Sequence, residues 1–491
     1  MDKTSLTSSK LKNLGASLTN SNKLRNTWVA VFTLLSVFVV GMLGVRFLSF
    51  SLAASAVLIV LIYVRTRLKS EQSNPIFTNS KLHWVSFFVP LTLAIDLYSV
   101  RLSSLVLTSL IGTTYLQKER QSIQLTIGPL LLLLASMLVS LQTLSPSKIA
   151  TPVLIFVLVY RLVLTVKNHV LIPSVIDGYG LLLFANVVGY TFGLSSPRAT
   201  GRIGGLVESN GFTRVIFPFS ESVNALPIIA AIVFVAVLTL REQASRMRYS
   251  LRLLWLVAAT IVLYKSGNRA SVLILVFFLL LSIASLKFLQ KISRSATVIS
   301  ISSSIVLPTI TTTMAGIILP ITSILAAGRN SITSETFNYE GRIVIWEESI
   351  DFWRKWATNP WDQLVGFGQN GSYKSGASLS YSRFLETIVL NPELAGVHNS
   401  FLQQLFDGGV LGVALLGSAT MWASYRASNQ IFRSNSLYTA LTTSLAMLLF
   451  YGISETFTAP GSASQPFWAL VVFIGIACQR LDNEFLPKEN S

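Results

Sequence analysis

Long apolar runs recur along the whole chain and are separated by short polar segments. A helix that crosses a bilayer needs about 20 mostly apolar residues. Candidate spans lie at 28–45, 47–64, 84–100, 102–116, 124–144, 150–166, 172–192, 222–240, 251–264, 270–286, 296–325, 401–424, 437–453 and 465–478. The pattern predicts an all-α polytopic membrane protein with about 12–14 transmembrane helices. The pair 84–100 and 102–116 is joined only by Arg101, so a re-entrant element is an alternative there.

Composition supports this interpretation. Hydrophobic residues make up 52% of the chain and charged residues 12%, against roughly 25% charged residues in a soluble protein. So few charges could not cover a water-facing surface of this size. The net charge of +17 would suggest nucleic acid as the partner of a soluble protein, but in a membrane protein it reports topology, and no nucleic-acid partner is expected. The single cysteine, Cys478, excludes an intramolecular disulfide.

The positions of lysine and arginine predict the orientation. With the N-terminus inside, most basic residues fall in inside segments, as the positive-inside rule requires. The C-terminus is then also inside, and the protein is expected in the cell (inner) membrane. The predicted organisation is a cytosolic polar tail at 1–27, a bundle at 28–325, a large extracytoplasmic loop with amphipathic helices at 326–400, further spans at 401–478 and a cytosolic tail at 479–491.

Several kinds of site are absent from the sequence. There is no GxxxxGK[ST] phosphate loop, no HExxH motif and no paired-cysteine metal site, so neither a metal nor a cofactor is expected. Of the three histidines, His83 and His169 fall at inside helix ends, where a solvated imidazole is the simplest interpretation. His398 differs, because it lies at the outer end of the large loop, directly before a span.

Three arginines depart from the positive-inside pattern and lie outside, beside spans. Arg202 is in ATGRIGG, Arg269 in KSGNRAS, and Arg342 opens the helix-like segment GRIVIWEESIDFWRKW. One interpretation is that each pairs with lipid phosphates. Arginine is also the side chain that best captures a phosphate through two parallel hydrogen bonds. Together with His398, the three arginines therefore suggest a site for a phosphorylated, membrane-bound ligand.

The segment that begins at Arg342 has the pattern of an amphipathic helix. Arg342, Trp346, Ser349 and Trp353 recur at i, i+4, i+7 and i+11, which places them on one face. That face either lies in the membrane interface or packs on protein. Asn359-Pro360 should end the helix. The glycines at 366 and 368 in LVGFGQNG then predict a tight turn.

These motifs, in this order, resemble those of a known family. SGNRAS, GRIVIW, GFG and HNSFLQQLFDGGVLG are similar to the motifs of the O-antigen ligase and O-antigen polymerase superfamily of bacterial surface polysaccharide assembly. The resemblance covers about residues 180 to 425. It implies a membrane glycosyltransferase of the GT-C type, which takes a glycan from undecaprenyl diphosphate and passes it to a glycan or lipid A-core acceptor in lipopolysaccharide biosynthesis.

The resemblance also implies roles for the residues above. Arg202, Arg269 and Arg342 would stabilise the diphosphate leaving group without a metal. His398 would take the acceptor hydroxyl proton, since a neutral imidazole near pH 7 suits a general base, and the reaction would invert the anomeric carbon. Asn399 would orient a substrate or, more simply, cap the next helix. Trp346, Gly366 and Gly368 would support the site.

Two alternatives stay open from the sequence. Within the family, a ligase and a polymerase share these motifs. A transporter or flippase of lipid-linked sugars would use the arginines only for binding, and Asp96 and Asp177, which lie inside apolar segments, would then form a proton path. Convergence of Arg202, Arg269, Arg342 and His398 on one outer site would favour the enzyme, whereas a pocket at the midplane would favour the transporter.

Overall fold

A computed structural model describes residues 83–98, 100–115, 127–142, 146–197, 206–209, 212–240, 246–303, 306, 342–385, 392–431, 435–462 and 464–479. The chain divides into two units, 1–64 and 65–491, and every described residue belongs to the second. The predicted spans at 28–45 and 47–64, the tail at 1–27, the segment 307–341 and Arg202 lie outside the described residues.

The described part is mostly helical. Its long helices are α3 (Trp84–Ile95), α4 (Val100–Tyr115), α5 (Ile127–Leu141), α6 (Pro146–Thr165), α7 (Asn168–Thr191), α8 (Ala225–Thr239), α9 (Arg246–Ser266), α10 (Arg269–Ala284), a helix over 286–303, α13 (Arg342–Trp356), α17 (Ser400–Asn429), α18 (Asn435–Tyr451) and α19 (Gln465–Cys478). Each predicted apolar segment from residue 84 to the end of the chain therefore contains a helix, although the segment 296–325 is described only in its first part.

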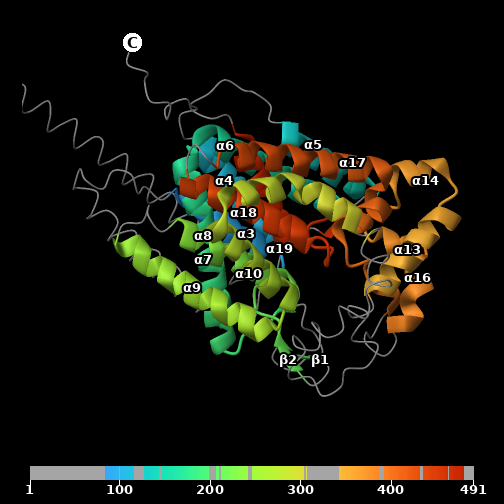
Figure 1. Ribbon diagram of the computed structural model, residues 1–491, viewed down its shortest axis with the longest axis horizontal. Helices are drawn as coiled ribbons and strands as arrows, with labels where there is room; N and C mark the ends of the chain where they lie inside the picture. The colour runs from blue at the N-terminus through green and yellow to red at the C-terminus, as the bar shows by residue number, and fades with distance from the viewer. Residues whose placement is uncertain are drawn as a thin grey trace, which may run out of the picture. The chain divides into compact units, whose positions relative to one another are not determined.

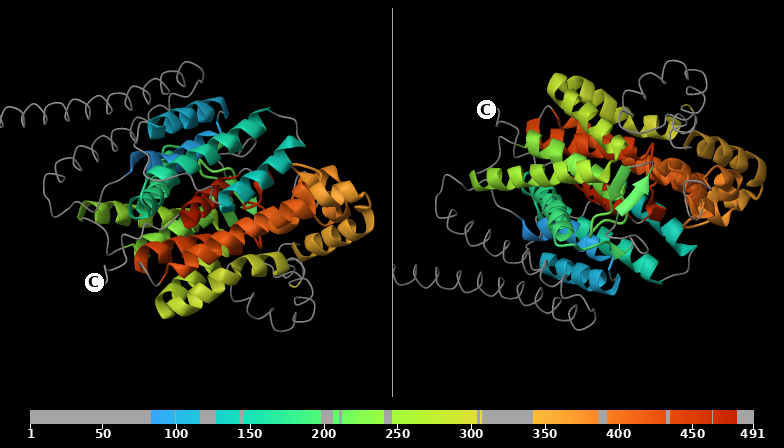
Figure 2. Two further views of the ribbon diagram at one scale, coloured as in Figure 1. Left: turned by 90° about the horizontal axis from the view of Figure 1, so that it is seen from above. Right: turned by 90° about the horizontal axis from the view of Figure 1, so that it is seen from below.

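Helices distant in the sequence pack side by side in the bundle. Figure 1 and Figure 2 show α17 lying along α5, while α18 and α19 lie at the centre against α8 and α6. The side chains of α19 are buried along its whole length, and so are most of those of α8. Helices that are apolar on all sides belong in the core of a large protein or in a membrane.

Helix length limits what can be stated about the membrane. Among the described helices, α7 and α17 are long and apolar enough to cross a bilayer, and the apolar stretches of the other apolar helices, such as Ile149–Thr165 of α6, are 10–17 residues long. At a rise of about 1.5 Å per residue, helices of 12 to 17 residues cover only part of a hydrocarbon core of about 30 Å. The polytopic arrangement and the number of spans stay predictions.

The prediction of an all-α protein needs one correction. Strands β1 (Leu206–Ser209) and β2 (Phe212–Val215) form an antiparallel hairpin, with Leu206 opposite Val215 and Ser209 opposite Phe212. The sequence contains the cause, because Asn210-Gly211 lies between the two strands. Asn-Gly between apolar residues is a strong short-range signal for a two-residue hairpin turn.

A compact lobe at one end of the bundle is formed by residues 342–385, called here the α13–α16 lobe. After α13 it contains α14 (Pro360–Val365), α15 (Gly371–Lys374) and α16 (Ala377–Ser382). As predicted, α13 ends before Asn359-Pro360. Asn359 accepts a hydrogen bond from the Trp361 N–H and so caps α14, with Pro360 at its first position, where a missing N–H costs nothing.

The aromatic face of α13 packs on protein. Trp346 is 2% exposed and shares a buried cluster with Tyr381, Val397 and Phe406. Trp353 meets the ring of Phe406 edge to face, with 5.3 Å between the ring centroids. The opposite face carries the exposed ion pair Lys355–Asp351. Of the two sequence-based alternatives for this face, the structure shows the packed helix.

Candidate functional site

A buried carboxylate joins Arg342 to His398. Arg342 donates from Nη2 to Glu455 Oε1 at 2.7 Å, and His398 Nδ1 lies 3.4 Å from Glu455 Oε2. The Glu455 side chain is 2% exposed, that of Arg342 11% and that of His398 35%. The imidazole is therefore the most accessible part of the group, while the carboxylate lies behind it.

The charge on Glu455 is set by its neighbours. Burial alone raises the pKa of the Glu455 carboxyl, but Arg342, His398 and Arg214 together outweigh burial and hold this pKa below its ordinary value of 4.5. The carboxylate is thus ionised at neutral pH. A buried charge without partners would be strongly unfavourable, so the surrounding donors are what allow Glu455 to lie there.

Four further polar side chains complete the cluster. Asn224, which precedes α8, donates to Glu455 Oε1 at 3.0 Å and accepts from Arg214 Nη2 at 2.6 Å. Asn268, which precedes α10, also donates to Asn224 Oδ1, at 2.9 Å. The Tyr451 hydroxyl at the end of α18 donates to the Asn224 carbonyl. We call Arg214, Asn224, Asn268, Arg342, His398, Tyr451 and Glu455 the Glu455 cluster.

The start of α17 fixes His398 relative to Glu455. Asn399 accepts hydrogen bonds from the Phe401 and Leu402 N–H groups and thereby caps the helix, as predicted. Its amide also donates to the Ile453 carbonyl. The Ser400 hydroxyl donates to the Glu455 carbonyl at 2.7 Å. Hydrogen bonds therefore join the backbone segment that follows His398 to the segment that carries Glu455.

His398 itself has an unusual backbone conformation. Its φ is +50°, in the left-handed region that few residues other than glycine adopt. Trp346 Nε1 donates to the carbonyl of the preceding residue, Val397, at 2.9 Å. A strained backbone held by its surroundings is common at functional sites. Trp346 thus links α13, which carries Arg342, to the segment that carries His398.

Of the two predicted arginines that the structure describes, Arg342 belongs to the Glu455 cluster and Arg269 lies at the start of α10. The structure brings Arg342 and His398 to the same carboxylate. Arg269 is the first residue of α10 and is exposed; its neighbour Asn268 belongs to the Glu455 cluster. Arg202 lies outside the described residues. Arg214, from the same predicted loop as Arg202, contributes to the cluster through Asn224.

Gly366 and Gly368 serve a different part of the structure. The N–H groups of Phe367 and Gly368 donate to the Phe406 and Asp407 carbonyls of α17, at 2.8 and 2.9 Å. A Cβ on Gly366 would lie 2.5 Å from the Gly409 nitrogen. The two glycines allow this turn to approach the backbone of α17 closely, so their contacts explain a structural role for the GFG motif.

Of the seven residues of the Glu455 cluster, the sequence singled out Arg342 and His398 and missed Arg214, Asn224, Asn268, Tyr451 and Glu455. A signal was present for two of these five. Glu455 lies in SETFTAP, the short segment between α18 and α19. It is the one acidic residue between two apolar runs, and this is the signal that could have singled it out. Arg214 offered a similar signal as a second basic residue in the predicted outside loop that contains Arg202.

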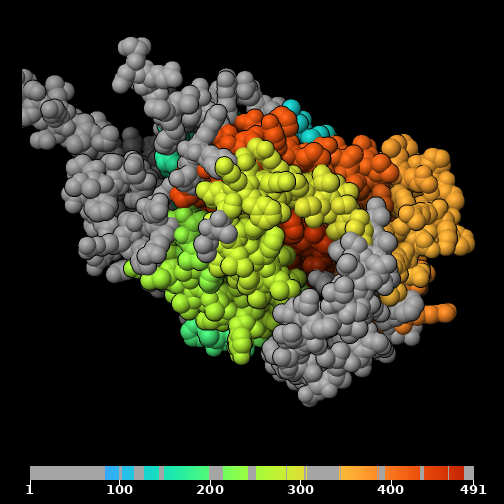
Figure 3. Space-filling model, viewed as in Figure 1, coloured from blue at the N-terminus to red at the C-terminus, as the bar shows by residue number. Residues whose placement is uncertain are grey.

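The cluster lies at helix ends that the charge pattern assigns to the outer side. These are the starts of α8, α10 and α17 and the end of α18. Figure 3 shows red atoms of the C-terminal part at the floor of a recess that the yellow and yellow-green helices around α10 border. The surface is thus hollowed beside the elements that carry the cluster.

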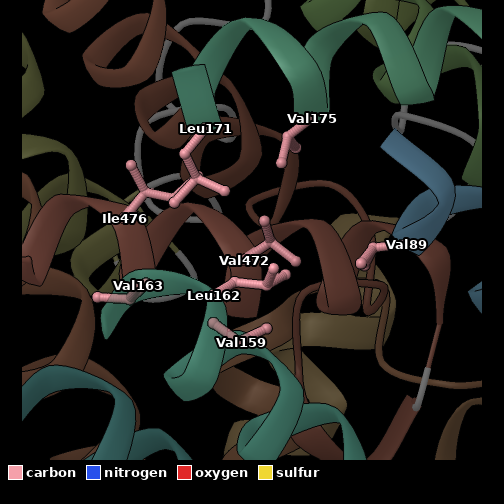
Figure 4. Close-up of a pocket in the computed structure, with 8 residues that line it drawn as sticks. All are labelled: Val89, Val159, Leu162, Val163, Leu171, Val175, Val472 and Ile476. Carbon is pink, nitrogen blue, oxygen red and sulfur yellow. The ribbon is translucent and has the colours of Figure 1, made fainter. Parts of the chain in front are cut away.

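The described part of the bundle also shows the surroundings of Asp96 and Asp177 and one apolar cavity. Figure 4 shows a cavity lined only by aliphatic side chains, among them Val159, Leu171 and Val472, and apolar cavities of this kind stay dry. Asp177 forms a buried ion pair with Arg252 at 3.5 Å, and Asp96 accepts from the Ser103 hydroxyl at 2.9 Å. Both aspartates therefore have a polar partner in the structure.

Within the described ranges, no group of three or more histidine, cysteine or acidic side chains has an arrangement that could hold a metal ion. The chemistry available at the Glu455 cluster comes instead from guanidinium groups, one imidazole and one carboxylate. Such a set can bind an anion, orient a base and move a proton.

No protein-family model matches the sequence, and comparison with curated proteins finds no significant match.

Proposed function

We propose that the chain is a membrane glycosyltransferase that uses a glycan linked to a polyprenyl diphosphate, of the O-antigen ligase or polymerase type, with the Glu455 cluster as its active site. The observation that carries the proposal is the meeting of Arg342 and His398 on Glu455, because an anion-binding cation and a candidate base 56 positions apart (398 − 342) share one carboxylate.

The reaction assigns a task to each group. His398 takes the proton of the acceptor hydroxyl, whose oxygen forms a bond to the anomeric carbon of the donor. The bond between that carbon and the diphosphate oxygen breaks on the opposite face, and the configuration inverts. Arg342 stabilises the negative charge that develops on the leaving diphosphate. Arg269, and Arg202 from outside the described residues, are proposed to add to this stabilisation.

Glu455 fits this chemistry as the residue that orients the base. With the Nδ1–H of His398 directed at the carboxylate, the lone pair of Nε2 is left for the acceptor proton. This is the relation that a carboxylate has to histidine in hydrolase triads. The separation of 3.4 Å is long for a hydrogen bond, and such contacts often tighten only when substrate is bound.

The membrane location and the topology belong to the same proposal. Apolar helices whose cluster-bearing ends coincide with the predicted outer side support an active site at the outer leaflet, where a lipid-linked donor would present its diphosphate. The inner membrane of a bacterial cell is the proposed location, and a glycan or a lipid A-core is the proposed acceptor.

A deletion strain tests the proposal. Loss of the gene should alter the surface polysaccharide, wild-type protein should restore it, and His398→Ala and Arg342→Ala should not restore it at equal membrane abundance. Arg383→Ala is the matched control, because Arg383 is an exposed arginine of the same lobe. An unchanged surface polysaccharide in the deletion strain would refute the proposal.

The same strain distinguishes the two enzyme types. Surface glycans that carry a single repeat unit would identify a polymerase. Unmodified acceptor together with stored lipid-linked polymer would identify a ligase. A flippase would instead leave the lipid-linked glycan on the inner leaflet, where enzymes added to intact spheroplasts cannot reach it.

A further inference from the structure

Glu455 contacts two groups that have different tasks in the proposed reaction. Its Oε1 accepts from Arg342 and Asn224, and its Oε2 faces His398 Nδ1. The same guanidinium is proposed to bind the donor diphosphate. Diphosphate oxygens that bind this guanidinium offset its charge, so the attraction between Arg342 and Glu455 weakens when the diphosphate binds.

We propose that Glu455 is a positioning residue that releases Arg342 to the donor diphosphate. This exchange of partners by Arg342 turns the carboxylate fully toward His398 and makes His398 the stronger base. Donor binding would thus prepare the imidazole for the acceptor. The inference rests on the proposed function, since it assumes that a diphosphate binds at Arg342.

The electrostatics give the sign of the effect. Among the described residues, the charged and titratable groups that act on Glu455 are Arg342 from α13, His398 before α17, Arg214 from β2 and Tyr451 from α18. While Arg342 is paired with Glu455, its charge offsets that of the carboxylate. Once a diphosphate takes Arg342, the potential at His398 becomes more negative, and a negative neighbour favours the protonated imidazole.

The exchange also allows His398 to release its proton after transfer. After transfer, His398 holds the proton of the acceptor hydroxyl. Departure of the diphosphate returns Arg342 to Glu455, and the restored pair weakens the hold of the carboxylate on the imidazolium. His398, 35% exposed, can then release its proton to water. The low exposure of Glu455 makes each change of partner matter, because charges interact more strongly away from water.

Binding of inorganic pyrophosphate to the purified full-length protein is the direct test. Glu455→Gln keeps the shape and the hydrogen-bonding oxygen but removes the competing charge. This variant should bind pyrophosphate about tenfold more tightly than wild type, in the direction that loss of a competing anion predicts. Arg342→Ala should lose binding, and Glu347→Gln, an exposed residue of α13, should match wild type.

Transfer kinetics supply a readout that a purely structural role would not produce. Glu455→Gln should lower both KM for the donor and kcat, because the donor binds without competition while His398 loses its orienting charge. The acid limb of its pH–rate profile should move to lower pH. Glu455→Asp should keep donor binding near that of wild type and lower kcat, since the charge remains but its reach is shorter.

The outcomes separate this inference from the proposed function. If Arg342→Ala abolishes pyrophosphate binding but folded Glu455→Gln binds no better than wild type, the exchange is wrong and the donor site stands. If pyrophosphate binding ignores Arg342, the donor site itself is wrong. Should Glu455→Gln fail to fold, the wild-type His398 signal, one of only three histidine signals, decides: the exchange requires its NMR titration midpoint to rise with pyrophosphate, and an unchanged midpoint refutes it.

Discussion

Gly409 combines a positive φ with close backbone neighbours, so a side chain there should be strongly unfavourable. It interrupts α17 with φ 65° and ψ −166°, a region that glycine occupies almost alone and that costs other residues about 1–3 kcal/mol. A Cβ there would lie 2.3 Å from the Leu364 carbonyl oxygen and 2.6 Å from the Gly366 nitrogen. Both atoms are backbone, so no side-chain rotation can relieve the contact, and overpacking adds roughly 1–3 kcal/mol.

Gly409→Ala should therefore lower the free energy of unfolding by about 2–6 kcal/mol, the sum of these two costs. The matched control is Gly112→Ala in α4, where a Cβ would meet nothing within 4 Å and where alanine should stabilise the helix by roughly 0.5–1 kcal/mol. Thermal unfolding of the purified proteins in one detergent gives the comparison. Equal midpoints for the two variants would refute the account of the α14–α17 junction.

Three further outcomes are expected. Arg342→Lys should impair transfer strongly, because lysine keeps the charge but lacks the planar fork, and Arg342→Ala should nearly abolish transfer, with normal membrane insertion of both variants. If both variants were as active as the control Arg383→Ala, Arg342 would be a lipid-binding residue. Transfer should survive EDTA and should slow on acidification as His398 becomes protonated, so strict dependence on added metal would contradict the mechanism. The pKa of Glu455 is lower in the folded protein than in the unfolded protein, so the stability that Glu455 contributes is present above its unfolded pKa and is lost as pH falls through its folded pKa. The free energy of unfolding of Glu455→Gln should therefore depend less on pH below about pH 4.5. An unchanged pH dependence would show that Glu455 is not held by charge.

The helices could be predicted because their signals are local. The segment 465–478 is α19 to the residue, and 437–453 differs from α18 by two residues at each end. Asn399 was recognisable as a cap because a side-chain acceptor before an apolar run is a local signal. The packing of Trp346 could not be decided in the same way, since an amphipathic face looks alike whether it meets lipid or protein.

The partners in the Glu455 cluster could not be predicted from one sequence. Glu455 and Arg342 are 113 positions apart, and Asn224 and Glu455 are 231 apart. Only the packing of α8, α13, α17 and α18 brings them together. The charge pattern placed Arg202, Arg269 and Arg342 outside, beside predicted spans, but did not single out Arg214, whose contribution depends on a hairpin and on Asn224.

Glycan transfer by the purified protein tests the central claim most directly. The lipid-linked glycan that accumulates in the deletion strain serves as donor, and release of polyprenyl diphosphate is measured together with glycan attached to acceptor. Wild-type protein should release one lipid diphosphate for each glycan transferred. His398→Ala and Arg342→Ala should neither transfer glycan nor release lipid diphosphate, although their thermal unfolding transitions should match that of a folded protein. Transfer by His398→Ala at the wild-type rate, or no release by wild type with donor and acceptor both present, would contradict the assignment of this site as a glycosyltransferase centre.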